Sequence, residues 1–107
     1  MSLDLLSTVD LDPDEGEVLD AELAVRDDVL LKLFALGPGG TIDPHEHGTS
    51  TNVFHVVRGT VTVTREDEEE EIAAPGVVLN DRGQAHGAHN PGNEVALLTA
   101  ALCPLPG

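Results

Sequence analysis

The sequence has few aromatic residues, a single cysteine and a single lysine. Phe34 and Phe54 are the only aromatic residues among the 107, and tryptophan and tyrosine do not occur. Hydrophobic residues nevertheless make up 40 % of the chain, so the core is expected to consist of valine, leucine, isoleucine and alanine. Cys103 has no second cysteine in the chain with which to form a disulfide bond, which is typical of a reducing compartment.

Long apolar runs are also missing. No stretch approaches the roughly 20 apolar residues that a membrane-spanning helix needs. The first ten residues, MSLDLLSTVD, contain no basic residue and no long apolar segment, so they lack the features of a secretory signal. We therefore expect a cytoplasmic protein that does not bind membranes.

Basic residues are scarce. Five lysines and arginines stand against twenty aspartates and glutamates, which gives a formal net charge of −15. This charge repels nucleic acid phosphates and anionic lipid headgroups, so neither is an expected partner. Ordinary acidic proteins also carry an acid excess. We favour adaptation to high intracellular salt, where counterions screen the repulsion between carboxylates.

The length and the turn signals indicate one small β-domain. A chain of 107 residues suffices for one compact domain, which we expect over residues 1–107, with a core at about 17–102 and short, loosely attached tails. Clusters of turn-forming residues recur at short intervals, with strand-length segments between them. The predicted turns are DPDEG at 12–16, RDD at 26–28, GPGG at 37–40, RG at 58–59, EDEEE at 66–70, PG at 75–76, NDRG at 80–83 and NPGN at 90–93.

Several segments between these turns have strand patterns. VTVT at 61–64 alternates apolar and polar residues, which is typical of a half-buried strand. VLLKLFAL at 29–36 and VALLTAAL at 95–102 are nearly continuous apolar runs, and their short length without helix caps favours central strands. About eight strands predict an all-β sandwich or barrel. The acidic run 66–71 is expected at a solvated hairpin tip, because neighbouring carboxylates on a strand cannot converge on one cation.

The five histidines all lie between positions 45 and 89. His45 and His47 are two residues apart, so on a strand their imidazoles share one face. A third histidine from a distant, paired strand would complete a cluster that leaves positions on a metal ion open for water, substrate or dioxygen. The alternative is an exposed pair in a loop beside Pro44.

The segment around this pair resembles the first motif of the cupin superfamily. The stretch GGTIDPHEHGTSTNVFHVVRG starts at Gly39 and ends at Gly59. Its first and last glycines and the two histidines, His45 and His47, match the motif in register. Asn52 stands where the motif has a glutamate.

A second segment is similar to the second cupin motif. In DRGQAHGAHN, the residues Gly83, His86 and Asn90 match, while Asp81 replaces a proline. The resemblance implies a double-stranded β-helix, or jelly roll, that holds one divalent metal ion through His45, His47 and His86. The ion would be iron, zinc, nickel or manganese.

Three further residues bear on this implied site. His55 and His89 have the opposite strand parity from Asn52 and His86, so we expect their side chains to point away from the metal. A neutral amide is a weaker ligand than a carboxylate, so Asn52 is at most a weak fourth ligand and the charge of the site stays near +2. Such a site favours an anionic or chelating ligand.

The family includes enzymes and binding proteins, so the fold does not decide the function. Our first hypothesis is a metal-dependent enzyme of the dioxygenase type that acts on a small chelating organic acid, ketone or thiol. The alternative is a non-catalytic module that binds or senses a small molecule, and a third possibility is a structural barrel without metal. We also expect a homodimer, because dimers are common among cupins and exposed edge strands favour pairing.

Overall fold

The computed structural model describes residues 3–106, and this range contains nine β-strands and one short 3-10 helix. No helix among these residues is long and apolar enough to cross a membrane. In chain order the elements are η1 (Leu5–Thr8), β1 (Val18–Val25), β2 (Leu30–Leu36), β3 (Thr41–His45), β4 (Thr51–Arg58), β5 (Thr60–Arg65), β6 (Glu68–Ala73), β7 (Gly76–Asn80), β8 (His86–His89) and β9 (Ala96–Cys103).

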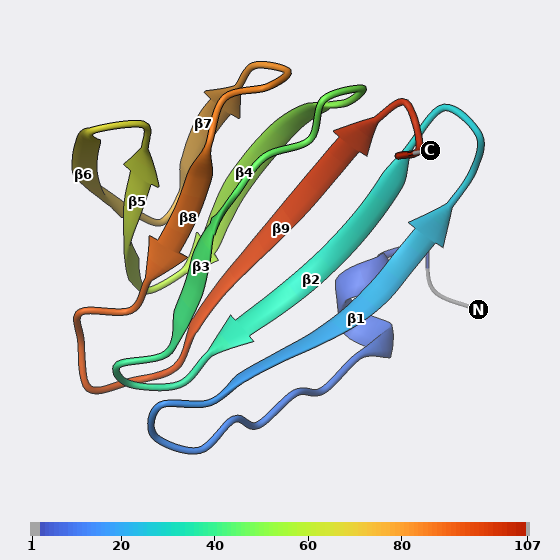
Figure 1. Ribbon diagram of the computed structural model, residues 1–107. Coiled ribbons are helices and arrows are strands. Elements are labelled where there is room, and N and C mark those ends of the chain that lie inside the picture. The colour runs from blue at the N-terminus through green and yellow to red at the C-terminus, as the bar shows by residue number, and fades with distance from the viewer. Residues whose placement is uncertain (1–2, 107) are drawn as a thin grey trace.

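The strands form two sheets in which every pairing is antiparallel (Figure 1). One sheet has the order β1-β2-β9-β4-β7, and the other has the order β3-β8-β5-β6. Strands far apart in the sequence lie side by side, since β9 pairs with both β2 and β4. The predicted all-β fold is confirmed.

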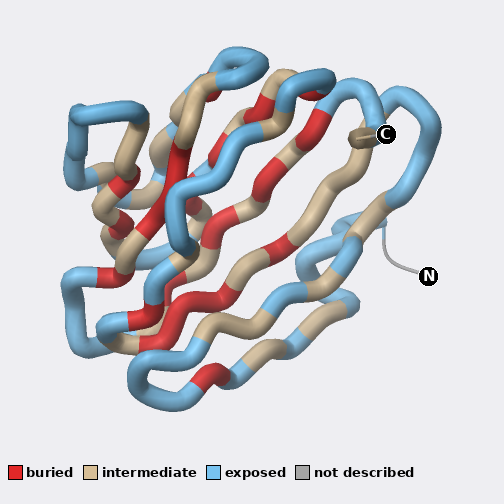
Figure 2. Tube along the Cα trace, viewed as in Figure 1, coloured by how far each residue is buried: buried red, intermediate tan, exposed pale blue. Residues whose placement is uncertain are grey.

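The core cluster draws residues from both sheets, so the core lies between them, and in Figure 2 the buried residues lie mostly in the strands while most connections are exposed. Along β9, buried residues alternate with half-buried ones, as expected for a strand with one face on the core. Apart from Phe54, the members of the core cluster are aliphatic, which confirms the prediction from composition. They are Leu36, Phe54, Val56, Val61, Val63, Ala88, Ala96, Leu98 and Ala100.

Each predicted turn overlaps an observed connection, although Arg58, Gly76 and Asn80 belong to the adjoining strands. The acidic run departs further from the prediction. Only Glu66 and Asp67 form the turn after β5, and the next four glutamates belong to β6. The prediction of a hairpin tip over the whole run 66–71 is therefore wrong. Strand β6 lies at the edge of its sheet and its glutamates are exposed on both faces, so the strand pairs through its backbone without burying a charge.

The terminal segments are more closely attached than the sequence predicts. The buried Ser50 hydroxyl donates a hydrogen bond of 2.7 Å to the Pro104 carbonyl, and the Leu105 amide donates to the Asp27 carbonyl at 3.2 Å. Near the N-terminus, Leu6 lines a surface cavity together with Leu33 of β2. Both ends therefore pack on the five-stranded sheet.

Candidate metal centre

Strand pairing brings His45 and His86 together. His45 ends β3, His86 begins β8, and the two are register partners across the antiparallel pair. The register shifts just before His45, where Pro44 passes close to Gly87. A Cβ at Gly87 would lie 2.6 Å from the Ile42 carbonyl oxygen, so only glycine lets the two strands approach in this way.

His47 reaches the site from a loop. It follows the end of β3, so the expectation that it shares a strand with His45 is wrong. The Gly83 amide donates a hydrogen bond of 3.0 Å to the His47 carbonyl. This bond joins the loop after β3 to the turn before β8, and it holds the backbone of His47 next to the segment that carries His86.

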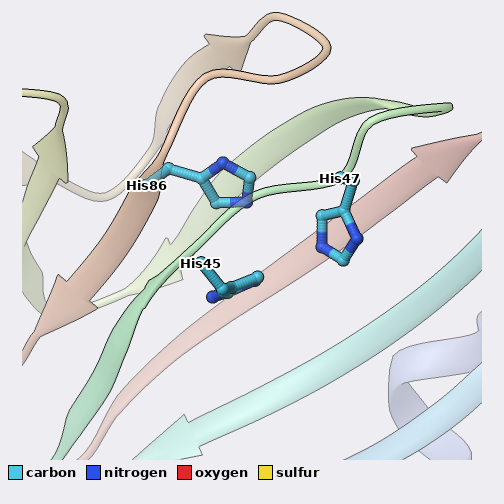
Figure 3. Close-up of side chains that lie close together, drawn as sticks. All are labelled: His45, His47 and His86. Carbon is cyan, nitrogen blue, oxygen red and sulfur yellow. The ribbon is translucent and has the colours of Figure 1, made fainter.

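The three imidazoles face one another (Figure 3). One ring nitrogen from each of His45, His47 and His86 lies within 4.8 Å of the other two, and no other such group of histidine, cysteine or carboxylate side chains occurs in residues 3–106. The distances between ring centroids are 4.7 to 5.6 Å. The Phe54 ring lies nearly at right angles to that of His86, with centroids 5.4 Å apart.

Hydrogen bonds to carbonyl groups define the tautomers of two of these rings. Nδ1 of His45 lies 2.9 Å from the Asp43 carbonyl oxygen, and Nδ1 of His86 lies 2.9 Å from that of Gln84. A carbonyl oxygen only accepts, so each Nδ1 carries the proton and each Nε2 has a free lone pair. Nε2 of His86 is buried without a hydrogen-bond partner, and an unpaired buried group of this kind costs about 1–3 kcal/mol.

Burial favours the neutral form of His47 and His86. It is the main cause that lowers the pKa of His47, and repulsion from His45 lowers that pKa further. Burial likewise lowers the pKa of His86, although the hydrogen bond to Gln84 opposes the shift. Metal ions bind the neutral form of histidine, so the residues present fit a divalent metal ion.

A cavity of about 210 Å³ is bordered by two of the three histidines, His45 and His47. Its wall is mainly apolar, and Lys32 is the only lysine, arginine, aspartate or glutamate among the described residues that line it. The lining residues are Leu30, Lys32, Phe34, Ile42, His45, His47, Asn52, Phe54, Ala100, Leu102 and Pro106. A small, largely apolar ligand with a polar group at the histidines fits this space.

Asn52 lies in the wall of the same cavity and is buried. Its side-chain oxygen accepts a hydrogen bond of 2.8 Å from the amide nitrogen of Asn80, its register partner on β7. One lone pair of the Asn52 oxygen is therefore used within the protein. Its role as a weak metal ligand stays a prediction.

The other histidines lie apart from this cluster. His55 is exposed on β4, and Nδ1 of His89 is 2.8 Å from the Thr41 hydroxyl. The acidic residues nearest the site in sequence, Asp43, Glu46 and Asp81, are exposed and do not line the cavity. The cavity therefore offers no carboxylate from the described residues as a general acid or base.

Asn90, which matches the second motif, and Lys32, which interrupts an apolar run, have roles that the sequence alone did not reveal. The amide nitrogen of the buried Asn90 donates to the carbonyls of Leu36 and Glu94, at 2.9 and 2.7 Å, so this motif residue supports the backbone. Lys32 belongs to an apolar run of the sequence, yet it lines the cavity. Its position as the one charged residue within that run is the signal that could have identified it.

The family comparison matches a model described as a cupin domain to residues 32–102. This range includes both histidine motifs and six complete strands, from β3 to β8. No curated protein matches the sequence.

Solved structures share the fold over nearly the whole chain. TT1209 from Thermus thermophilus is 27 % identical, with a TM-score of 0.85 and coverage of 96 % of both chains. A Klebsiella pneumoniae protein described as having a double-stranded beta-helix domain is 21 % identical, with a TM-score of 0.84 and coverage of 96 % of this chain and 89 % of that one. A predicted oxalate decarboxylase from Thermotoga maritima is 24 % identical, with a TM-score of 0.79 and coverage of 84 % and 83 %. The expected double-stranded β-helix is therefore confirmed.

Proposed function

The chain belongs to the cupin family, and from this premise we propose that it binds one divalent metal ion through His45, His47 and His86. The observation that carries the proposal is the convergence of three ring nitrogens within 4.8 Å, one of them the buried and unpartnered Nε2 of His86. Iron, zinc, nickel and manganese all accept imidazole ligands. When bound, the ion would supply Lewis acidity and a template for the ligand.

The ligand of this site is a small chelating organic acid, ketone or thiol. Three neutral imidazoles leave the charge of a dication uncompensated, so an anionic group is favoured. The cavity of about 210 Å³ exceeds the roughly 150 Å³ that suffices for benzene, so it has room for a ligand somewhat larger than benzene. The apolar wall would orient the ligand and exclude water from it.

The reaction that we propose is of the dioxygenase type. The chain's own residues then bind and position the ligand, and they supply no general acid or base apart from the histidines, because no carboxylate of the described residues lines the cavity. The same observation favours the second candidate, a non-catalytic module that binds or senses a small molecule. Turnover distinguishes the two candidates.

The first test is elemental analysis of protein purified without added metal. We expect about one transition-metal ion per chain in the wild type and none in His86→Ala, with His55→Ala as the matched control that keeps the metal. A wild-type protein that stays metal-free after dialysis against each of the four ions would contradict the proposal.

Oxygen uptake by the metal-loaded protein is the second test. A panel of diketones, 2-oxo acids and thiols should include at least one compound that is consumed together with dioxygen. Tight binding without consumption would assign the protein to the non-catalytic candidate.

We also propose that the chain forms a homodimer. Strand β7 lies at the edge of its sheet, and Val77 and Leu79 on it are 66 % and 52 % exposed. Apolar side chains on an edge strand favour association. Light scattering should give twice the mass of one chain, and Leu79→Lys should reduce it to the mass of one.

A further inference from the structure

Lys32 is the only lysine of the chain, and it lies on the cavity face of β2. Leu30 and Phe34, two residues away on either side, also line the cavity, as expected from the alternation of side chains along a strand. Its register partner on β9, Ala100, lines the cavity as well. The direction of the Lys32 side chain is thus fixed by three neighbours on the same face.

The ammonium group of Lys32 is held between two partners. It lies 5.0 Å from the centre of the Phe34 ring and 2.7 Å from a carboxylate oxygen of Asp20. The Lys32 side chain is 26 % exposed and that of Asp20 is 48 % exposed. A partly exposed ion pair of this kind is weak, so the ammonium group can exchange Asp20 for a ligand at small cost.

The charge of the whole molecule makes this position informative. With a net charge of −15, the protein repels anions in general, so an anionic ligand must be attracted locally. None of the four arginines lines this cavity. The cationic groups available to a ligand inside it are therefore Lys32 and an ion at the histidines.

We propose that Lys32 binds an anionic group of the ligand, and that the ligand carries a carboxylate in addition to the group that chelates the metal. The inference rests on the proposed function, since it places the chelating group at His45, His47 and His86. It narrows the ligand class from small chelators in general to chelators with a second, negatively charged end. Lys32 is thus a specificity residue.

The experiment compares two probes of nearly equal size on the metal-loaded protein. Succinic acid monohydroxamate and 4-methylpentanohydroxamic acid share a chelating head, but the first ends in a carboxylate and the second in an isopropyl group. Calorimetry gives the Kd of each for the wild type and for Lys32→Met. We expect Lys32→Met to weaken the carboxylate probe relative to the isopropyl probe by about tenfold, because it removes one charge-assisted hydrogen bond.

Matched variants separate this role from a structural one. Lys32→Arg should keep most of the wild-type ratio between the Kd values of the two probes, whereas Lys32→Gln should behave like Lys32→Met. Asp20→Asn should strengthen binding of the carboxylate probe, because it releases the ammonium group of Lys32. A Kd ratio that is the same in the wild type and in both neutral variants would overturn the inference, as would a failure of both probes to bind. Metal content is measured first, so a wild type that holds no metal contradicts the proposed function itself and not only the role of Lys32.

Discussion

At the scale of single residues, Asn52 combines a structural hydrogen bond with a position beside the histidines. Its oxygen accepts from Asn80, and its side chain lines the cavity. Asn52→Ala should leave metal affinity nearly unchanged but destabilise the fold by about 1–3 kcal/mol, because the buried Asn80 amide loses its acceptor. Titration with metal measures the affinity, and thermal unfolding measures the stability. Asn80→Ala is the matched control, because it removes the other partner of the same hydrogen bond.

Asn52→Glu should change metal and ligand affinity in opposite directions. A carboxylate adds charge attraction and a harder oxygen donor, so the metal should bind more tightly than in the wild type. An anionic chelator should bind less tightly, because the site then carries less positive charge. If Asn52→Ala loses metal as completely as His86→Ala does, Asn52 is a required ligand and the three-histidine account is wrong.

The lowered pKa values of His47 and His86 predict how stability depends on pH in the metal-free protein. Both fall below the ordinary histidine value of 6.5, so near that pH the unfolded chain binds protons that the folded chain does not. The free energy of unfolding should be constant above about pH 7 and should decrease as the pH falls through about 6.5. Denaturant unfolding from about pH 8 to about pH 5 measures this. In a double variant, His47→Gln with His86→Gln, most of the pH dependence of the unfolding free energy that these two groups contribute should disappear.

At the scale of elements, the approach of β3 to β8 depends on Gly87. A Cβ there would lie 2.6 Å from a backbone oxygen of β3, and backbone atoms cannot move aside as a flexible side chain can. Gly87→Ala should therefore separate the two strands and weaken metal binding by at least about tenfold, since the His45–His86 pairing is part of this contact. Gly48→Ala is the matched control, because a Cβ at that position meets no atom within 4 Å. Equal metal affinity in both variants would contradict this account.

The sequence predicted the elements better than their arrangement. The apolar runs at 29–36 and 95–102 correspond to β2 and β9 with boundaries shifted by at most one residue. Apolar residues continue along both strands because one face is buried and most residues of the other are half-buried. The placement of β9 between β2 and β4 was not predictable from local patterns, since it depends on contacts between distant segments. The prediction for the run 66–71 was wrong because four consecutive glutamates of β6 show no alternation of apolar and polar residues, which is the pattern that predicts a strand.

The candidate site was predictable in its histidines but not in its cavity. The spacing of His45 and His47 and the second motif pointed to residues that the structure brings together. Which side chains line the cavity depends on strand register, and register cannot be read from residue types alone. The charge of Lys32 within an apolar run marks the residue in the sequence, but only the fold shows that it lines the cavity.

At the scale of the whole molecule, most acidic side chains of residues 3–106 have no ion-pair partner within that range. Two ion pairs occur within residues 3–106, Lys32 with Asp20 and Arg65 with Glu68, against a net charge of −15. Screening shortens the range of repulsion from about 10 Å at 0.1 M salt to about 3 Å at 1 M. The melting temperature should therefore rise steadily from low to molar potassium chloride. A melting temperature that does not change over this range would argue against adaptation to high salt.

The Gly83 amide, which donates a hydrogen bond to the His47 carbonyl, can be used to follow the opening of the metal centre. Amide protons exchange with solvent when the bond that protects them opens, and opening here requires the loop of His47 to leave the turn before β8. An ion shared by His47 and His86 would hold these two segments together and slow the exchange at Gly83. A single amide signal, followed by NMR in deuterated water, would then measure how often the metal centre opens, without any knowledge of what the protein binds.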